Sequence, residues 1–360
     1  MGKKATFLLS RFLIALLTLA FASLAIAGWF ARVIPPHSSW FISMMALGMF
    51  PLLVFNVTTL LFWSFRKSLW AVVPLAAILI NIEYIGAFFG VNPWAKKEAL
   101  PTEIKIATYN IHGYSHKDFY NVLDTALNYF DEQHVDIVCF QEFCGEPNYN
   151  YNELNSRYPF QRVMSDFRCM KLAIFSKDSI REAQLIQFEE SFNSAMTAEI
   201  LFDGKSINLI NIHLQTTNLN QSEEELFQIK NYGIDTPEGT KAINIIVERL
   251  KENARIRTQQ VDIIRKEIDK KIDSRLIVCG DFNDPPFTYT YHTLKKGLYD
   301  GSREIGRGSG HTFNPIFKIF RLDYIFYSNA FSGLHRTSPR LPWSDHNPVI
   351  LEMAFNKESK

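Results

Sequence analysis

Polar residues recur in this 360-residue chain at the points where short apolar runs end. They are mainly carboxylates, amides and imidazoles, and the apolar pattern alone would not place them there. Oxygen-rich sets of this kind suit hard cations such as Mg²⁺ or Mn²⁺, whereas zinc would need Cys and His at short spacings that the sequence lacks. The clusters are 109–112, 141–142, 211–214, 280–284 and 344–348, with 321–324 opening one further run.

Strands lying side by side would bring these clusters to one edge of a sheet. A single Asp or His at such a point is more often a cap or a satisfied core group than a site residue. Six clusters in the same topological position indicate a shared site instead. The residues expected to meet there are Glu142, Asp281, Asp323, Asp345, His213, His346, Asn110, Asn211 and Asn283.

The elements that must position this site are short strands with a few helices. Runs of β-branched and aromatic residues bounded by turn residues predict strands, at 104–111, 136–141, 172–176, 195–202, 207–214, 275–280, 322–327 and 348–355. Apolar spacing near 3.6 residues predicts helices, at 118–133 and 241–272. Several strands are apolar on both faces, which favours two packed sheets with helices outside. The polar, acidic stretch 218–239 is expected to be a surface loop.

Charge is distributed unevenly along the chain. Residues 1–94 hold six basic side chains and one acidic, while 95–360 hold 32 basic and 36 acidic, a net charge of −4. The whole chain carries +1, so it lacks the basic excess of proteins that coat nucleic acid non-specifically. Four Cys in 360 residues exclude a disulfide scaffold.

Three apolar stretches predict transmembrane helices, near 12–31, 40–65 and 69–89. A cleavable signal peptide is the alternative for the first, because 25–27 reads Ala-Ile-Ala, although the uncharged run is long for one. Within the third, Glu83 either reaches the polar surface from near a helix end or is a functional carboxylate. The expected organisation is a transmembrane region at 1–94, a linker at 95–102 and a polar domain at 103–356.

Basic residues near the span ends give a weak orientation bias. With the N-terminus inside, five lie on the cytoplasmic side (Lys3, Lys4, Arg11, Arg66 and Lys67) and four on the other. This predicts a multi-pass protein of the cell (inner) membrane, with residues 95–360 on the extracytoplasmic side.

Cysteine usage does not decide the compartment. Cys139 and Cys279 lie in strand-like runs and are expected to be buried thiols, while Cys144 and Cys169 either pair or stay free.

Taken in order, the motifs resemble those of the endonuclease/exonuclease/phosphatase superfamily of metal-dependent phosphoesterases. That family has an Asn after its first strand, then Gln-Glu, Asn-x-His-Leu, Gly-Asp-x-Asn, Arg-x-Asp-Tyr and Ser-Asp-His, and residues 103–356 carry all six in order. The resemblance implies a four-layered α/β sandwich with its site at one edge of the two sheets.

The resemblance also implies roles at the metal and at the attacking water. Glu142 would be the principal ligand of Mg²⁺ or Mn²⁺, with Asn110 beside it and Asp345 at or near the ion. Asp281 would orient or deprotonate the water, and Asn283 would hold either the phosphate or Asp281.

Further residues would contact the phosphate. His346 matches the histidine at the scissile phosphate, and Asp323 matches the acid that fixes its tautomer and favours the imidazolium. Asn211 and His213 match phosphate contacts. His112 either contacts substrate or metal or only caps the strand end.

The implied activity is hydrolysis of a phosphate monoester or diester by a membrane-anchored enzyme, with a lipid head group or nucleic acid as substrate and no obligate protein partner. His112 and Phe143-Cys144 stand where apurinic endonucleases have Asp and Thr-Lys, which disfavours DNA repair. Val278-Cys279 and Arg321-Leu322-Asp323 differ from the corresponding 5-phosphatase segments, which disfavours inositides. The alternatives are a membrane-anchored endonuclease and a non-catalytic binding protein of the same fold, and the complete set of acids argues against the latter.

Overall fold

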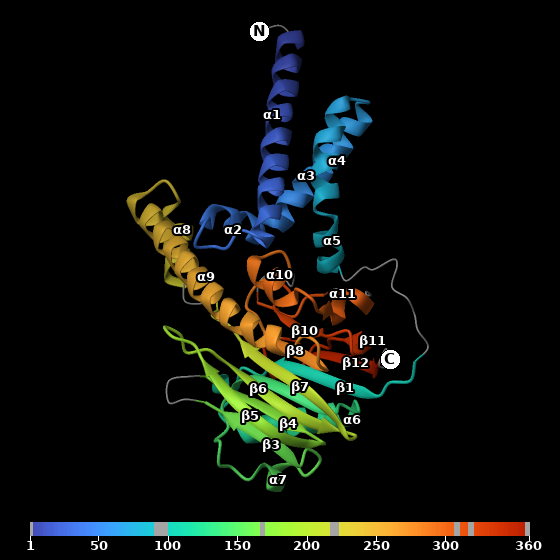
Figure 1. Cartoon of the computed structure of the whole chain (residues 1–360). Helices are drawn as coiled ribbons and strands as arrows, with labels where there is room; N and C mark the ends of the chain where they lie inside the picture. The colour runs from blue at the N-terminus through green and yellow to red at the C-terminus, as the bar shows by residue number, and fades with distance from the viewer. Residues whose placement is uncertain are drawn as a thin grey trace.

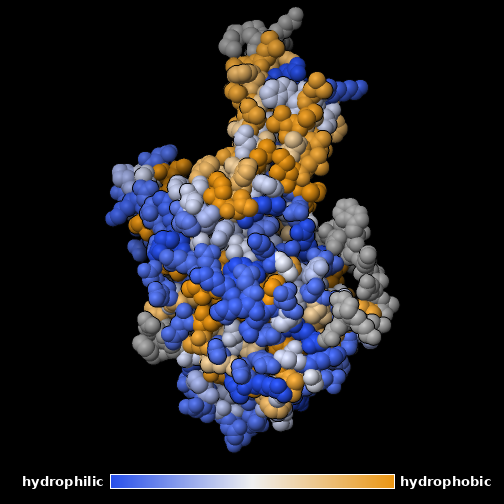
Figure 2. All heavy atoms as spheres, in the orientation of Figure 1, coloured by the Kyte–Doolittle hydropathy of each residue, from blue (hydrophilic) through white to orange (hydrophobic). Residues whose placement is uncertain are grey.

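The computed structural model describes residues 3–89, 100–165, 170–216, 223–305, 310–315 and 320–356. A bundle of helices at residues 3–89 stands on an α/β domain that comprises the rest (Figure 1). The apolar surface of the view in Figure 2 gathers over the bundle, whereas the α/β domain is largely hydrophilic.

Within the described residues, two six-stranded sheets form the α/β domain. Their orders are β11-β12-β1-β2-β4-β3 and β5-β6-β7-β8-β10-β9. The pairs β1–β2 and β7–β8 are parallel and the others antiparallel, so both sheets are mixed. The strands are β1 (Ile104–Asn110), β2 (Ile137–Phe143), β3 (Phe160–Met164), β4 (Lys171–Ser176), β5 (Ser179–Gln187), β6 (Ser194–Phe202), β7 (Lys205–His213), β8 (Leu276–Asp281), β9 (Tyr299–Asp300), β10 (Asp323–Tyr327), β11 (Phe331–Thr337) and β12 (Val349–Phe355).

The two sheets pack face to face with helices outside. Inward side chains such as Ile106 and Leu209 form the core between the sheets. Helix α6 (Phe119–Glu132) covers the β1–β2 sheet with an apolar face that includes Leu123. Helices α9 (Pro237–Lys271) and α10 (Tyr289–Lys295) cover the other sheet. The predicted α/β sandwich of two mixed sheets flanked by helices is therefore confirmed.

The eight predicted strands and two predicted helices are present, with shifts at their ends. Helix α9 begins at Pro237, where Thr236 caps it by accepting a hydrogen bond from the Gly239 amide. Strands β3, β5, β9 and β11 were not predicted, and all four lie at sheet edges, where partly exposed strands weaken the apolar pattern. Helices α7 (Tyr151–Leu154), α10 and α11 (Gly301–Ile305) and the 3₁₀ turn η3 (Gly113–Ser115) were not predicted either.

The predicted loop at 218–239 is wrong over most of its described part. Helix α8 (Glu223–Tyr232) occupies it and packs beside α9, while 217–222 lie outside the described residues. A polar helix on a helical neighbour lacks the wide apolar stripe by which helices are recognised in sequence. The Arg249 guanidinium reaches from α9 to the Glu225 carboxylate at 3.2 Å and ties the two helices together.

The cysteine predictions are confirmed where they can be followed. Cys139 and Cys279 are buried free thiols, and Cys144 is also free. Cys169 lies outside the described residues.

The bundle consists of α1 (Lys3–Trp29), η1 (Phe30–Arg32), α2 (Trp40–Leu47), α3 (Met49–Phe65), η2 (Leu69–Ala71), α4 (Val72–Ile80) and α5 (Ile82–Phe89). Helix α1 runs from the free end of the bundle to the α/β domain, and α5 descends to the same domain (Figure 1). The Arg66 guanidinium lies 5.3 Å from the Phe7 ring, which places the turn after α3 at the free end beside the start of α1.

Three uninterrupted spans were expected, and the described residues contain one. Phe7–Arg32 alone is long and apolar enough to cross a membrane as a single helix. The stretches at 40–65 and 69–89 are each two helices, bent by 66° and 54°, so there are up to three spans only if each bent pair counts as one.

Local chemistry explains both bends. Pro51 has no N–H to continue the helix across Gly48 and lies in the first turn of α3 instead. Asn81, between α4 and α5, donates its amide to the Ala25 carbonyl at 3.2 Å and to the Ala77 carbonyl at 2.9 Å.

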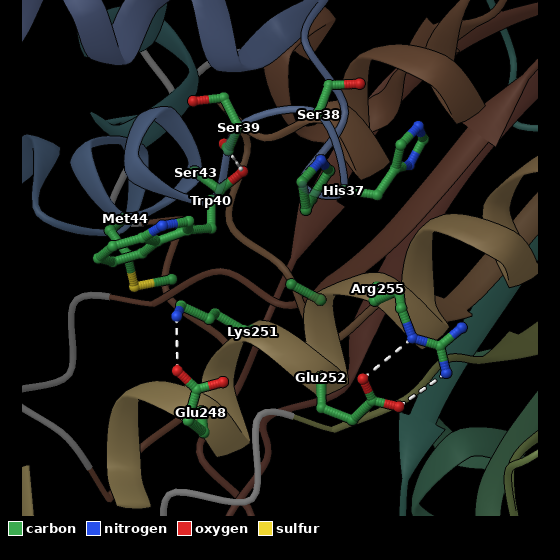
Figure 3. A pocket seen from close by; sticks show the side chains of 12 residues that line it. His37, Ser38, Ser39, Trp40, Ser43, Met44, Glu248, Lys251, Glu252 and Arg255 are labelled. Atoms are coloured by element: carbon green, nitrogen blue, oxygen red, sulfur yellow. Dashed lines mark hydrogen bonds and ion pairs between the residues drawn. The ribbon is translucent and has the colours of Figure 1, made fainter. Parts of the chain in front are cut away.

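The bundle is in direct contact with the α/β domain. The Glu83 carboxylate lies 3.2 Å from the Arg32 guanidinium and 3.7 Å from that of Arg303 in the domain. Glu83 is thus a half-exposed ion-pair partner at the junction. On the other side of the bundle, Lys251 of α9 lies 4.6 Å from the Trp40 ring, beside a hollow of about 320 Å³ between 36–44 and α9 (Figure 3).

Candidate active site at the strand ends

Parallel and antiparallel registers bring the predicted site residues to one edge of both sheets. Asn110 lies opposite Gln141 at the ends of β1 and β2. In the second sheet, Asp281 at the end of β8 lies between His213 of β7 and Asp323 of β10. Asp281 is therefore central because two neighbouring strands each present a titratable side chain beside it.

Asn110 links the two sheets at this edge. Its amide nitrogen donates to Glu142 Oε1 and to Asp281 Oδ2, both at 3.0 Å. The β2–β4 register shifts between Phe140 and Phe143, and Glu142 takes a left-handed backbone with φ of 50°. A bulge of this kind redirects a side chain, and here it brings the half-buried Glu142 carboxylate toward Asp281.

His346 and Asp323 form a buried pair. His346 Nδ1 lies 2.9 Å from Asp323 Oδ2, and Nε2 lies 3.7 Å from Asp281 Oδ2. Burial disfavours the charged ring, but the carboxylates of Asp323 and Asp281 outweigh it and raise the pKa of His346 to about 10. At neutral pH the ring is an imidazolium with two donors.

The pKa of Asp281 is higher than that of an ordinary surface carboxyl group. Burial raises its pKa, and although the positive charge of His346 acts against this, the pKa stands at about 7. A carboxylate that titrates near neutral pH can accept a proton from water and release it again.

His213 is buried between the two acids. Its Nε2 lies 3.7 Å from Glu142 Oε1 and 3.9 Å from Asp281 Oδ2, and neither ring nitrogen has a hydrogen-bond partner. Burial lowers its pKa, so the ring is neutral near pH 7. Buried polar groups normally have hydrogen-bond partners, so the two ring nitrogens of His213 could bind a ligand between the two carboxylates.

The predicted asparagines have their polar atoms engaged. Asn283, which takes a left-handed backbone, donates its backbone N–H to Asp281 Oδ1 at 2.9 Å and its side-chain amide to the Leu214 carbonyl at 3.0 Å. Asn211 is instead buried between the two sheets. Its amide donates to the carbonyls of Phe140 and Ala173 in the facing sheet and accepts from Gln141 at 2.6 Å.

His112 and Asp345 pair with each other at the rim. His112 Nδ1 lies 3.0 Å from Asp345 Oδ1, and the hydrogen bond to this carboxylate raises the pKa of His112 against its partial burial. Ser344, the residue before Asp345, donates to the Asn110 carbonyl at 2.7 Å and so ties this rim to β1.

The donor set fits a divalent cation. Carboxylate oxygens of Glu142 and Asp281 converge on one amide, with the unpartnered His213 beside them. In the described residues, one group of three side chains places possible ligand atoms within 4.8 Å of one another, namely Asp281, Asp323 and His346. Among these groups the carboxylates suit a hard divalent cation, whereas the protonated His346 ring has no free lone pair to offer as a ligand.

Comparison with known families now bears on this geometry. The profile described as Endonuclease/Exonuclease/phosphatase family matches residues 107–346, which include every site residue described above. The chain belongs to this family. Residues 10–88 match a second profile, a domain of unknown function designated DUF8431, and a comparison with curated proteins found no match.

Solved structures support the fold of this family member. The structure of D. rerio TDP2 with a single-strand DNA product aligns with a TM-score of 0.52 at 18% identity, covering 70% of this chain and 98% of that one. The human Nocturnin catalytic domain with bound sulfate aligns with a TM-score of 0.50 at 16% identity, covering 71% and 94%. At identities this low, the structural alignments show a shared fold alone.

Two residues that hold the His346–Asp323 pair were not predicted. Thr312 Oγ1 accepts from the Leu322 and Asp323 amides at 2.9 and 3.1 Å, and the Phe313 ring lies 5.0 Å from that of His346. No strand or motif surrounds them in the sequence, so only their position in space reveals them.

Proposed function

We propose that the protein is a membrane-anchored, Mg²⁺-dependent hydrolase of phosphate esters. The observation that carries the proposal is the charge arrangement at Asp281. The buried Asp281 carboxylate lies 3.7 Å from Nε2 of His346, and the Glu142 carboxylate accepts from the same Asn110 side-chain amide. Burial raises the pKa of Asp281 above the usual range of a carboxyl group. A site of this kind can take a proton from water while binding the negative charge of a phosphate.

The residues divide the chemistry between them. The His346 imidazolium would donate Nε2–H to a phosphate oxygen, with Asp323 holding its orientation through Nδ1. Asp281 would accept a proton from the attacking water, and the backbone N–H of Asn283 keeps the Asp281 carboxylate in place. A divalent cation held by Glu142 and Asn110 would supply stabilisation of negative charge on the phosphate and leaving group.

Membrane anchoring rests on the bundle. Its helices expose large apolar side chains such as Phe12, Leu61 and Phe65, which water would not stabilise (Figure 2). The N-terminal basic residues and Arg66 lie at the free end, whereas Arg32 lies at the domain end. Because basic residues near the ends of spans favour the cytoplasmic side, this separation would place the α/β domain outside the cytoplasm.

A substrate panel tests the proposed activity. The full chain in detergent micelles would be assayed with bis-p-nitrophenyl phosphate, p-nitrophenyl phosphate, sphingomyelin and plasmid DNA, with Mg²⁺ and with EDTA. We expect EDTA-sensitive turnover that is lost in Asp281→Asn. Turnover unaffected by EDTA, or absent from the whole panel, would reject the proposal.

Nucleic acid is the alternative substrate class. The TDP2 structure with a single-strand DNA product shows that this fold can hold such a ligand in that protein. The net charge of −4 over residues 95–360 acts against tight binding to a polyanion, though not against transient turnover. Cleavage of plasmid without turnover of sphingomyelin would favour a nuclease.

A further inference from the structure

We propose that helix α5 of the bundle holds the two loops that position Asp281, Asp323 and His346, so that the bundle is part of the working site as well as an anchor. The inference rests on the proposed function for its activity readout. It also has a structural readout that does not depend on the substrate.

The first loop runs from Asp281 directly into the bundle. Six residues after Asp281, Phe287 is 7% exposed and belongs to the bundle's own apolar core. Its ring centroid lies 3.5 Å from that of Tyr84 on α5. A residue of the α/β domain is therefore buried by the bundle, and without α5 this ring would be exposed to solvent.

The segment between the two ends of this loop is restrained. The Asp284 carboxylate lies 3.1 Å from the Arg257 guanidinium of α9, with both side chains almost fully buried. Arg257 also donates to the Gln215 carbonyl at 2.7 Å, just after the β7 strand that carries His213. Pro285 and Pro286 follow, with fixed φ angles. Two fixed φ angles leave little freedom between Phe287 and Asp284, so a shift at Phe287 would strain the Asp284–Arg257 ion pair that holds the segment after Asp281.

The second loop, described over residues 310–315, also contacts α5. A Cβ atom at Gly310 would lie 3.2 Å from the Phe88 carbonyl oxygen and 3.8 Å from that of Ala87, so the backbone at Gly310 passes directly over the end of α5. Two residues later Thr312 accepts hydrogen bonds from the backbone around Asp323, and Phe313 packs on His346. The backbone N–H of Asn347 donates to the Thr312 carbonyl at 2.6 Å, which joins the same loop to the segment that carries His346.

Helix α5 is itself fixed on both sides. Asn81, before its first turn, bonds to the Ala25 carbonyl of α1, and Glu83 pairs with Arg32 and Arg303. One short helix thus contacts both loops while it is held by the first span and by the α/β domain. Tyr84 and Phe287 are positioning residues in this arrangement, since they act through the loop and not on the phosphate.

The test compares full-length variants in the same micelles. Phe287→Ala removes the domain's ring and Tyr84→Ala the bundle's ring, while Phe287→Leu and Tyr84→Phe keep the contact apolar. Phe55→Ala is the matched control, because it removes an aromatic ring that stacks on Phe21 at 3.8 Å inside the bundle. For each variant we would measure kcat, KM and hydrogen exchange of peptides that cover 281–288 and 310–315.

We expect the two alanine variants at the contact to lower kcat about 10- to 100-fold with a smaller change in KM. Small displacements of the reacting groups reduce the rate of the chemical step by factors of that order. Exchange should become faster in both loops while β5–β6 peptides stay as in the parent. Phe287→Leu, Tyr84→Phe and Phe55→Ala should stay within about threefold of the parent.

Two results would overturn the inference. One is unchanged loop exchange in both Phe287→Ala and Tyr84→Ala, and the other is an equal loss of kcat in Phe55→Ala, which would indicate general loosening of the bundle. A parent protein without turnover on any substrate would refute the proposed function, and loop exchange would still decide the role of α5.

Discussion

Asp281 shows how one side chain can be set for proton transfer by its neighbours. It is almost fully buried, which disfavours its charged form, and it lies beside a histidine ring whose positive charge favours that form. The result is a pKa of about 7 for Asp281, while the carboxylates of Asp323 and Asp281 raise the pKa of His346 to about 10. The two groups are therefore in their proposed working states, base and acid, between these values.

This arrangement predicts a bell-shaped pH profile. Activity should rise as Asp281 loses its proton near pH 7 and fall as His346 loses its proton near pH 10. Asp323→Asn removes a negative charge that stabilises the imidazolium, so the falling limb should move to lower pH by about one unit or more. The measurement is kcat/KM against pH for both proteins. A falling limb that stays in place would show that Asp323 does not support the charge on His346.

The pair should also act as a unit. His346→Ala deletes the proposed phosphate contact together with its orientation, so it should cost more than Asp323→Asn. Because both residues act through one contact, the loss in the double variant should be close to that of His346→Ala alone. If the two losses multiply, the residues work separately and their assignment as a pair fails.

Glu142 is expected to supply ligation and not core packing, because its side chain is only half-buried at a bulge. Glu142→Gln should lower metal affinity or rate by about 10- to 100-fold while leaving the fold intact. Titration of Mn²⁺ by calorimetry, with circular dichroism as the control for folding, checks both statements. Parent-like metal affinity in the variant would show that the ion binds elsewhere.

Among the elements, β8 restricts its sequence strictly at Gly280. Gly280 has φ of 137°, and a Cβ atom there would lie 1.9 Å from the Ile212 carbonyl oxygen of β7. Since β7 carries His213 one residue later, a side chain at position 280 would push apart the two strands that hold His213 and Asp281.

Gly280→Ala should consequently reduce the free energy of unfolding by well over about 1 kcal/mol. The matched control is Gly204→Ala in the β6–β7 turn, which also replaces a glycine of positive φ but meets no atom within 4 Å. Thermal unfolding of both variants in detergent would separate the steric contribution from backbone strain. Equal destabilisation would show that β7 yields readily at Ile212.

For the molecule as a whole, we predict that the α/β domain lies on the extracytoplasmic side of the membrane. The bundle places its free end, where the basic N-terminal segment enters α1 and Arg66 lies beside Phe7, away from the α/β domain. We expect an alkaline-phosphatase fusion at Lys360 to be active and a GFP fusion there to be dark, because the basic end should stay in the cytoplasm. An inactive phosphatase fusion with a fluorescent GFP fusion would reverse this topology.

The amino-acid sequence determined which residues could do chemistry and in which order they occur. Polar motifs at strand ends identify Glu142, Asp281 and His346 because strand alternation and register bring such ends to one edge, whatever the details of packing. The resemblance of those motifs to a known family predicted the fold, and the two mixed sheets with outer helices agree with that prediction.

Contacts between distant segments were decided only by the tertiary structure. The bend at Asn81, the polar helix α8 and the support from Thr312 depend on partners 10 or more residues away, which leave no periodic signal in the sequence. The same holds for Phe287, whose apolar side chain reads as an ordinary core residue of the α/β domain. Its burial against Tyr84 of the bundle exists only because the two parts of the chain pack together.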